Sequence, residues 1–380
     1  MEGAGCTSRP ASFIPSCSGL ATRRCPSVPW ALMKAEFVLD ALQVTHHPSP
    51  APHPALEDHL AHLRALLVED LVGFEDALLA SVDGSLAPLP DTSQHLIAAG
   101  GKRIRPLLVL LCGRAAGNLD ADKLRPLALA GELVHVATLL HDDVLDDADE
   151  RRHRPTPRLR WGNTASVLGG DYALTRALDC VDSVGHPAPM REAIATLRSL
   201  VEGEVLQAHL RGRLDVTHDD YMQVIERKTA SLFRWCARAG AHCGPHPSMA
   251  TALGHFGGAL GLAFQMIDDV IDYESPEGTS GKLPLADLRE GKMTLPLLLG
   301  LERDATLRPW LEQAQGKLPT DGAARRELIR RLQEVDAVGS ARALARAQAE
   351  AAAAALSPLA ASPYRAALEG IAYGLAERVR

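Results

Sequence analysis

Residues 124–147 read LRPLALAGELVHVATLLHDDVLDD, an apolar run with helical spacing that ends in four aspartates. On an α-helix, Asp142 and Asp146 lie on one face, one turn apart, with Asp143 beside them. Like charges at this spacing destabilise a helix by about 0.2–0.5 kcal/mol per pair. An acidic run is usually a solvated helix face, but the turns before this one are apolar. We therefore expect the helix to run from a buried environment into the acidic cluster.

A second acidic cluster repeats the DDxxD spacing. Residues 264–273 read FQMIDDVIDY, so Asp268, Asp269 and Asp272 have apolar neighbours on both sides. Carboxylates buried without compensation would be costly, so this pattern calls for a cation. Mg²⁺ binds few protein carboxylates and completes its shell with water and substrate phosphates. The two clusters together predict a site for divalent cations and a diphosphate.

Basic residues near these clusters suit a diphosphate ligand. The motif GGKRIRP at 100–106 places three cations beside a glycine pair, just before an expected helix. Backbone amides at a helix start and nearby cations favour phosphate. Each basic motif alone is more often a surface feature, but a surface role does not explain their joint occurrence with two DDxxD clusters. The other candidate cations are Arg151, Arg152, Lys228, Lys282 and Lys292.

The rest of the chain has a helical period. From residue 55 onward apolar residues recur at i, i+3 and i+4, turn signals separate the segments, and strand alternation is absent. No repeat that would indicate a solenoid is visible. We predict one all-α domain of about ten helices, with the central helices buried. The expected helices cover 106–116, 124–147, 164–182, 188–212, 218–242, 248–274, 292–303 and 323–356.

Composition excludes several classes of protein. The 380 residues carry a formal net charge of −7, which argues against nucleic-acid binding through a basic surface. No stretch approaches the roughly 20 apolar residues of a transmembrane helix. The seven cysteines contain no CxxC pair, so we expect free thiols in a reducing compartment and a cytoplasmic location.

The N-terminal residues differ from the remainder. Residues 1–54 are rich in Ser, Pro, Arg and Cys, and the prolines at 48–54 oppose any regular element. We expect 1–54 to be a disordered extension and 55–380 to be the catalytic domain. Residues 1–32 loosely resemble a transit peptide. We favour a plain tail or an artefact of translation upstream of Met33 over targeting.

The motifs GGKRIRP, LLHDDVLDDADERR, ERKTASLF, FQMIDDVIDY and GKLPLADLREGKMTLPLLL resemble, in order and spacing, those of the trans-isoprenyl (polyprenyl) diphosphate synthases. The resemblance covers roughly residues 60–380 and is to octaprenyl- and solanesyl-type, long-chain members. Class I terpene cyclases usually carry a different second motif. The resemblance implies an isoprenoid-synthase bundle of about ten or more helices around a central cavity. It also implies a homodimer, with peripheral membrane contact for product release.

The same resemblance implies residue roles. About three Mg²⁺ ions, with Mn²⁺ as an alternative, would be bound through oxygen ligands. The direct ligands would be Asp142, Asp146 and Asp268, supported by Asp143, Asp269 and Asp272. The allylic diphosphate would be held by Lys228, Arg151 and Lys282. The diphosphate of isopentenyl diphosphate would be held by Lys102, Arg105, His135 and Arg152. Gly101 and Lys292 would also belong to the substrate-binding residues. The developing carbocation would face Thr229, Gln265 and the carbonyl of Lys228. Asp147 is instead expected to pair with Arg151 at i+4.

The implied reaction joins an allylic diphosphate, farnesyl or geranyl, to successive isopentenyl diphosphates by ionisation, condensation and elimination. Residues four and five positions before Asp142 lie deeper along the expected tunnel. In the family an aromatic residue there stops the chain early, but here the residues are Thr138 and Ala137. We therefore expect a product of C30 or longer, with C40 as the central value, for a quinone side chain. The alternatives are a geranylgeranyl diphosphate synthase, with Phe233 or Trp235 closing the tunnel, and a non-catalytic subunit of a heteromeric synthase.

Overall fold

The computed structural model describes residues 66, 68–152, 154–274, 285–314 and 322–376. The expected disordered extension at 1–54 and the candidate Lys282 lie outside the described residues. Within them the protein is built almost wholly of helices, as predicted. The helices are α3 (Phe74–Ser81), α4 (Leu89–Ala98), α5 (Ile104–Ala115), α6 (Ala121–Leu145), α7 (Pro157–Trp161), α8 (Asn163–Asp182), α9 (Pro187–Leu210), α10 (His218–Ile225), the π-helix η1 (Glu226–Ala230), α11 (Ser231–His242), the 3₁₀ helix η2 (Pro247–Met249), α12 (Ala250–Glu274), α13 (Ala286–Arg289), α14 (Leu295–Arg303), α15 (Leu307–Ala314), α16 (Gly322–Glu334), α17 (Ala337–Ala355) and α18 (Pro363–Ala376).

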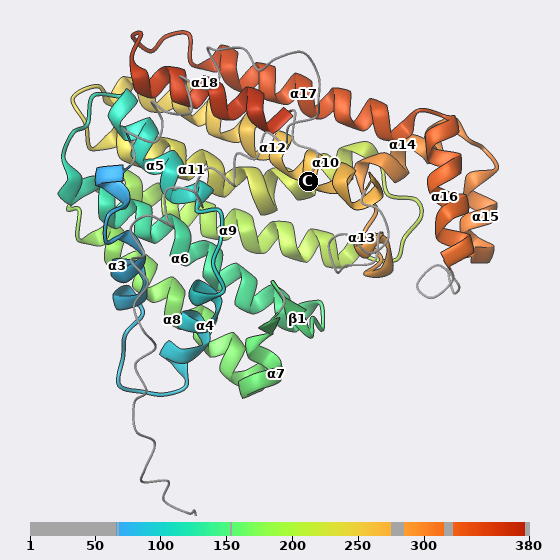
Figure 1. The fold of residues 1–380 in the computed structure, drawn as a ribbon, viewed down its shortest axis with the longest axis horizontal. Helices are drawn as coiled ribbons and strands as arrows, with labels where there is room; N and C mark the ends of the chain where they lie inside the picture. The colour runs from blue at the N-terminus through green and yellow to red at the C-terminus, as the bar shows by residue number, and fades with distance from the viewer. Residues whose placement is uncertain (1–65, 67, 153, 275–284, 315–321, 377–380) are drawn as a thin grey trace, which may run out of the picture.

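The centre of the bundle is the long apolar helix α12, which packs against α11 and α17 (Figure 1). Phe256 and Leu260 of α12 are fully or almost fully buried in the main core. The stretch Pro247–Glu274 is long and apolar enough to cross a membrane by those criteria alone. More than half of its apolar window is buried inside the protein, as expected for the core helix of a bundle.

Helix α6 is largely buried, and the first acidic cluster lies at its C-terminal end. Its start is capped by Asp120, whose side chain accepts a hydrogen bond from the amide of Asp122 at 3.1 Å. Its end is set by Asp147, which has the left-handed φ of 50° and cannot continue the helix. Asp142 therefore lies in the last turn and Asp146 caps its end, and α6 has no basic residue in that turn to offset the negative end of the helix dipole.

Two glycines permit the close packing that assembles the site. A Cβ atom on Gly261 of α12 would lie 2.7 Å from Cα of Ala230, so α12 and η1 approach closely only without a side chain there. A Cβ atom on Gly203 of α9 would lie 2.9 Å from the backbone nitrogen of Lys228. The helices α9, η1 and α12 are thereby held side by side around Lys228.

The structure corrects three expectations about secondary structure. The helix expected over 218–242 is interrupted by the π-helical turn η1. The helix expected over 323–356 is two helices, α16 and α17, because Asp336 has a left-handed φ of 51°. A short antiparallel hairpin, β1 (Glu150–Arg151) and β2 (Arg154–Pro155), comes after the first acidic cluster where no strand was expected.

Candidate active site

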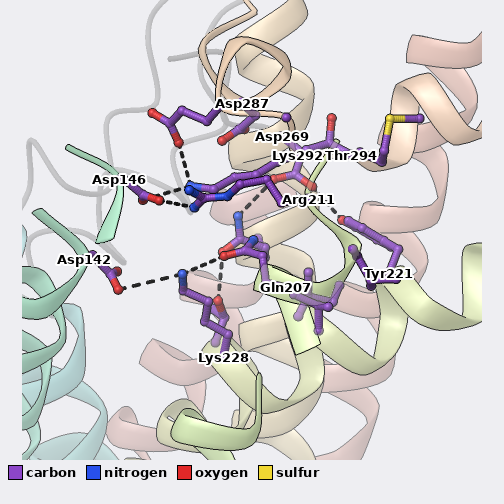
Figure 2. A pocket seen from close by; sticks show the side chains of 18 of the residues that line it. Asp142, Asp146, Gln207, Arg211, Tyr221, Lys228, Asp269, Asp287, Lys292 and Thr294 are labelled. Carbon is purple, nitrogen blue, oxygen red and sulfur yellow. Dashed lines mark hydrogen bonds and ion pairs between the residues drawn. The ribbon is translucent and has the colours of Figure 1, made fainter. Parts of the chain in front are cut away.

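A cavity of about 280 Å³ lies where the C-terminal ends of α6 and α12 face each other (Figure 2). Helices α9 and α10, the turn η1 and the segment 287–294 form most of the remaining wall. Both acidic clusters reach it, since Asp142 and Asp146 line it from α6 and Asp269 lines it from α12. No basic residue lies in the last turn of either helix, so the helix dipoles add to the negative charge of these aspartates. Positive charge in the same lining comes from Arg151, Arg211, Lys228 and Lys292.

The three aspartates of the first cluster have different partners. Burial raises the pKa of Asp142 to about 6, against the opposing charge of Lys228. Asp143 is fully buried and its Oδ1 accepts from Nε of Arg151 at 2.7 Å, while its Oδ2 has no hydrogen-bond partner. Burial also raises the pKa of Asp143. Burial acts in the same direction on Asp146, but Lys292 and Arg211 hold its pKa below the usual range.

The expected pair between Asp147 and Arg151 is wrong. Arg151 lies on β1 and turns back to Asp143. Asp147 is largely exposed, and one of its carboxylate oxygens lies 3.4 Å from a guanidinium nitrogen of Arg158. The i, i+4 rule does not apply here because the helix ends before Asp147.

The second cluster is more deeply enclosed. Asp269 is buried, and burial together with the nearby charge of Asp287 raises its pKa well above the usual value. Asp272 accepts hydrogen bonds from the amides of Ala286 and Asp287 at 3.0 and 3.2 Å, so it ties the start of α13 to α12. Asp268 is partly exposed. Each of these three residues lies in the last two turns of α12.

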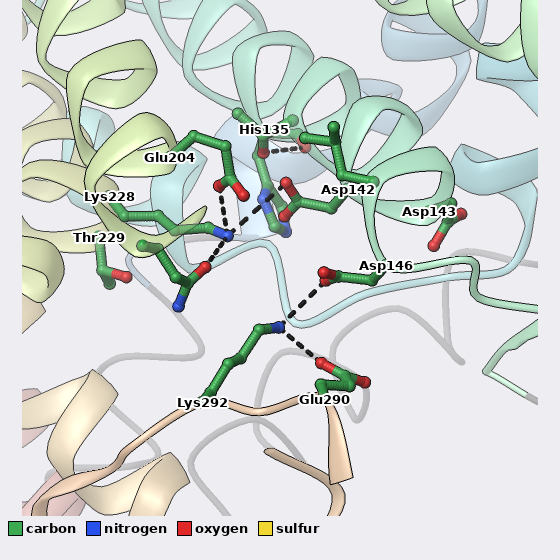
Figure 3. Close-up of polar contacts among 12 residues, drawn as sticks. His135, Asp142, Asp143, Asp146, Glu204, Lys228, Thr229, Glu290 and Lys292 are labelled. Carbon is green, nitrogen blue, oxygen red and sulfur yellow. Dashed lines mark hydrogen bonds and ion pairs between the residues drawn. The ribbon is translucent and has the colours of Figure 1, made fainter. Parts of the chain in front are cut away.

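Lys228 projects from η1 between the first acidic cluster and α9 (Figure 3). Its Nζ lies 2.5 Å from Oε2 of Glu204, 2.8 Å from Oε1 of Gln207 and 3.8 Å from Oδ1 of Asp142. The π-helical turn widens the backbone locally, a feature that is frequent at functional sites. Neighbouring polar groups thus hold the Lys228 side chain beside the first acidic cluster.

Lys292 reaches the same cluster from the opposite side (Figure 3). Its Nζ lies 3.0 Å from Oδ2 of Asp146 and 2.6 Å from Oε2 of Glu290. Burial would lower the pKa of Lys292, but these acids raise it above the usual value, so the side chain stays charged. The two predicted cations Lys228 and Lys292 therefore both face the aspartates of α6.

Thr229 and Gln265 belong to one hydrogen-bonded chain. The Thr229 hydroxyl donates to Oε1 of Gln265 at 2.8 Å, and Nε2 of Gln265 donates to Oδ1 of Asp269 at 2.9 Å. Tyr221 donates to the other oxygen of Asp269 at 2.7 Å. Because a carboxylate only accepts, the Gln265 amide must turn its nitrogen to Asp269 and its oxygen to Thr229.

The residues predicted to bind isopentenyl diphosphate form a second group. They lie at or just before the start of α5, on α6 and, for Arg152, in the hairpin after α6. Burial and then the charges of Arg105 and Arg152 lower the pKa of His135 well below its usual value, so the ring is neutral among arginines. A Cβ atom on Gly101 would lie 3.0 Å from a guanidinium nitrogen of Arg152. Nε of Arg105 is buried without a hydrogen-bond partner. Lys102 is partly exposed beside Gly101. This group is rich in positive charge, as a diphosphate requires.

The residues predicted to set product length lie on α6 about one turn before the first acidic cluster. Ala137 is fully buried, and the Thr138 hydroxyl donates to the backbone oxygen of His135 at 2.8 Å. Further down α6, a Cβ atom on Gly131 would lie 3.5 Å from the indole of Trp235. Trp235 is buried and its Nε1 donates to the backbone oxygen of Pro189 at 3.0 Å.

Comparisons with known proteins agree with this arrangement. The sequence model for the polyprenyl synthetase family matches residues 87–332. The chain belongs to the polyprenyl synthetase family. It is a polyprenyl diphosphate synthase, a prenyltransferase.

Octaprenyl diphosphate synthase of Escherichia coli (strain K12) is a similar member of this family, 36% identical over 331 residues that cover 85% of this chain and 100% of that protein. An all-trans-nonaprenyl-diphosphate synthase (geranyl-diphosphate specific) of Rhodobacter capsulatus is 32% identical over 85% of this chain and 99% of its own length. The fold is similar to the crystal structure of a Caulobacter crescentus CB15 polyprenyl synthase complexed with calcium and isoprenyl diphosphate. That structure has a TM-score of 0.79 and 34% identity, and the match covers 87% of this chain and 100% of that one.

Polyprenyl synthetases use divalent metal, and the side chains present fit such ions. Within the described residues, no three His, Cys, Asp or Glu side chains are close enough together to hold an ion by themselves. Oxygen donors nevertheless face each other across the cavity, and Oδ2 of Asp143 is buried without a partner. Burial raises the pKa of Asp142 and of Asp269, so positive charge nearby would favour their ionised forms. A hard cation bridged by water and diphosphate oxygens would supply that charge.

Besides Glu290 and Thr294, the sequence analysis missed five polar residues of this polyprenyl synthetase site. Glu204 and Gln207 had a usable signal, because they are polar neighbours at i, i+3 on the otherwise apolar face of α9. Asp287 lay inside a recognised motif but was not singled out, and burial raises its pKa to about 7. The sequence gives no comparable signal for Tyr221 or Arg211. The five residues are Glu204, Gln207, Arg211, Tyr221 and Asp287.

Proposed function

We propose that this chain is a trans-polyprenyl diphosphate synthase that condenses an allylic diphosphate with successive isopentenyl diphosphates, head to tail, to a long-chain all-trans product. The observation that carries the proposal is the pair of DDxxD clusters that face one cavity from the C-terminal ends of α6 and α12. Incubation with farnesyl diphosphate, labelled isopentenyl diphosphate and Mg²⁺, followed by product sizing, tests it.

The metal ligands proposed for Mg²⁺ are oxygens of both clusters. Asp142, Asp146 and Asp268 are the proposed direct ligands, since they lie at the C-terminal ends of α6 and α12. Asp143, Asp269 and Asp272 support them, each held by hydrogen bonds from neighbouring groups. When bound, the metal neutralises the charge that builds on the departing diphosphate.

The cations of the chain divide between two diphosphates. Lys228, Lys292 and Arg151 lie near the aspartates of α6 and are the proposed ligands of the allylic diphosphate, with Lys282 as a further one. The arginine-rich group around His135 is the proposed site for isopentenyl diphosphate, with Lys102, Arg105 and Arg152 as its cations. Two separate groups of positive charge suit a reaction with two diphosphate substrates.

The chain's residues favour ionisation of the allylic substrate and protect the cation. The cations hold the leaving diphosphate while the allylic C–O bond breaks. The orientation of Thr229 and Gln265 keeps a side-chain oxygen of each at the cavity, where electron pairs stabilise a carbocation. The double bond of isopentenyl diphosphate then attacks C1 of the cation. The departed diphosphate accepts the proton that is released, because no His–Asp or Ser–His pair in the sequence suggests a side-chain base.

The proposed product length rests on the wall of α6. Ala137 and Thr138 are small, so the elongating chain meets no aromatic floor one turn below Asp142. This supports a product of C30 or longer, with C40 as the central value. The primer is farnesyl or geranyl diphosphate.

One observation favours the shorter alternative, a geranylgeranyl-type product. The indole of Trp235 lies against Gly131, about three helical turns or about 16 Å below Asp142. A product that grew straight along this face would therefore meet the indole at that depth. A longer product has to bend past the indole.

A homodimer is the proposed assembly. Large apolar side chains on the outer faces of two neighbouring helices are exposed, and burying them in a second copy would remove them from water. They are Val167 and Leu168 of α8, and Ile194, Val201 and Val205 of α9. Light scattering of the purified protein tests this assembly, and a monomer at all concentrations would exclude it.

The remaining proposals concern the ends of the chain and its location. We propose that residues 55–380 form the catalytic domain and that 1–54 are an extension, with cytoplasmic location. The match of the family model to residues 87–332 supports the first part. Normal folding and turnover of a chain that begins at Met33 would support an extension that is dispensable over residues 1–32, and loss of either would exclude it.

A further inference from the structure

Arg211 is a cation of the site to which the family motifs assign no role. It comes directly after α9, where the chain leaves the helix with φ −58° and ψ 128°. It lines the same cavity as Lys228 and Arg151. Its Nη2 pairs with Oδ1 of Asp146, and its Nη1 donates to the backbone oxygen of Leu145 at 3.4 Å (Figure 2).

Arg211 and Lys292 together occupy both oxygens of Asp146. Nζ of Lys292 is 3.0 Å from Oδ2, while Arg211 pairs with Oδ1. These are the oxygens that a divalent ion would need at a carboxylate in the first DDxxD cluster. Two fixed positive charges next to the same carboxylate oppose the arrival of a divalent cation.

The two cations are carried by loops that touch each other. The amide of Gly212 donates to the backbone oxygen of Gly291 at 2.8 Å. Both glycines have φ 76°, a conformation that other residues adopt only with strain. A Cβ atom on Gly291 would lie 3.0 Å from the nitrogen of Gly212 and 3.1 Å from Cγ of Arg211. The glycine contact therefore fixes Arg211 and Lys292 as neighbours above the cavity.

Arginine chemistry determines how Arg211 responds when a divalent ion binds Asp146. A guanidinium does not lose its proton in proteins, so Arg211 must leave the carboxylate with its charge intact. Its planar fork matches two phosphate oxygens, and such bonds are stronger than neutral ones. A diphosphate that accompanied the metal would lie in the cavity that Arg211 lines.

We propose that Arg211 is a diphosphate-binding residue that competes with divalent metal for Asp146 until the diphosphate is bound. The proposal rests on the proposed diphosphate chemistry of the site. Removal of the Arg211 charge should therefore strengthen the binding of a divalent cation and weaken the binding of pyrophosphate. A salt bridge that only closes the cavity wall would not affect pyrophosphate binding.

The test is calorimetric titration of the full chain, wild type and Arg211→Met. The probes are Ca²⁺ alone, then inorganic pyrophosphate at saturating Mg²⁺. Arg211→Met should bind Ca²⁺ about threefold to tenfold more tightly, because a competing charge is gone. It should bind pyrophosphate about tenfold more weakly, because a charge-assisted pair is lost.

Arg213→Met is the matched control. Arg213 lies two residues further along, is about half exposed and pairs with Asp215 at 2.9 Å, outside the cavity lining. Both affinities of this variant should equal those of wild type. Arg211→Lys keeps the charge, so it should retain the wild-type Ca²⁺ affinity. Its pyrophosphate affinity should fall severalfold, because the planar fork of the guanidinium is lost. This variant tests the inference if Arg211→Met does not fold.

An unchanged Ca²⁺ affinity or an unchanged pyrophosphate affinity in Arg211→Met would overturn the inference. These titrations do not depend on product formation. If both shifts occur but the protein elongates no allylic substrate, the proposed function fails and the role of Arg211 stands. If elongation occurs without the shifts, the proposed function stands and the inferred role of Arg211 fails.

Discussion

The hydroxyl of Tyr221 donates a 2.7 Å hydrogen bond to Oδ2 of Asp269, and both side chains are buried. This contact joins α10 to the second acidic cluster. Through Asp269 it also fixes Gln265 and Thr229, since the three residues form one hydrogen-bonded chain.

Tyr221→Phe should therefore impair both stability and turnover. The change removes a donor from a buried carboxylate, which costs about 1–3 kcal/mol. We expect turnover to fall about tenfold while the apparent KM for isopentenyl diphosphate changes little, because that substrate's proposed site is elsewhere. Steady-state kinetics and thermal unfolding measure the two effects. Tyr172→Phe is the control, since its hydroxyl donates to a backbone oxygen at 2.8 Å on the protein surface. Equal losses of turnover in both variants would count against this role of Tyr221.

The metal-free protein should be destabilised by Asp142 at neutral pH. Burial raises the pKa of Asp142 from 3.8 to about 6, so the folded state binds a proton more tightly than the unfolded state. Stability should fall as pH rises from about 4 to about 6 and stay lower above that. Asp142→Asn should thus be more stable than wild type by about 2–3 kcal/mol at pH 7.5 without metal, and equal to it at pH 4.

Denaturant unfolding in EDTA measures this difference. Added Mg²⁺ should reverse the order, because the metal compensates the carboxylate in wild type and has lost a ligand in the variant. If the variant is less stable than wild type at pH 7.5 in EDTA, burial does not dominate at Asp142.

The basic residues should divide by substrate. Lys102→Ala should mainly raise the apparent KM for isopentenyl diphosphate, and Lys228→Ala should mainly impair use of the allylic diphosphate. The reason is that Lys228 lies beside Asp142, whereas Lys102 lies beside Gly101 and the arginine-rich group. Lys123→Ala, at an exposed pair with Asp120, should change neither. The division is refuted if Lys102→Ala and Lys228→Ala affect both substrates equally.

Product length should respond to two positions along the proposed tunnel, Ala137 on α6 and Trp235 on α11. Ala137→Phe should shorten the product, because it places an aromatic ring one turn below Asp142. Trp235→Leu should lengthen it if the indole against Gly131 limits growth. Trp310→Leu, remote from the cavity lining, is the control. Chromatographic sizing separates the outcomes. An unchanged product in Ala137→Phe would show that this wall of α6 does not set the length.

Much of the fold was predictable because the apolar period is regular. The helices around both DDxxD clusters were expected within a few residues of α6 and α12. The break at Asp336 was not, since a left-handed residue between two helices leaves the apolar period uninterrupted.

Residues of the candidate site were predictable where they belong to a sequence motif. They were not predictable where their position depends on how helices pack. Asp142, Lys228 and Lys292 were expected near one another and the structure brings them together. Arg211 and Tyr221 were not expected, because their roles depend on how α9 and α10 meet other elements. Asp272 was expected in the site, but its bonds to the start of α13 were not, since they depend on where α13 packs.

The most direct measurement is elongation by the purified protein. Farnesyl diphosphate and labelled isopentenyl diphosphate are incubated with Mg²⁺ or with EDTA, for wild type and for Asp268→Ala. The account predicts label in an all-trans polyprenyl diphosphate of C30 or longer, formed only by wild type with Mg²⁺. Absence of any elongated product under these conditions, or near-wild-type elongation by Asp268→Ala, would contradict it.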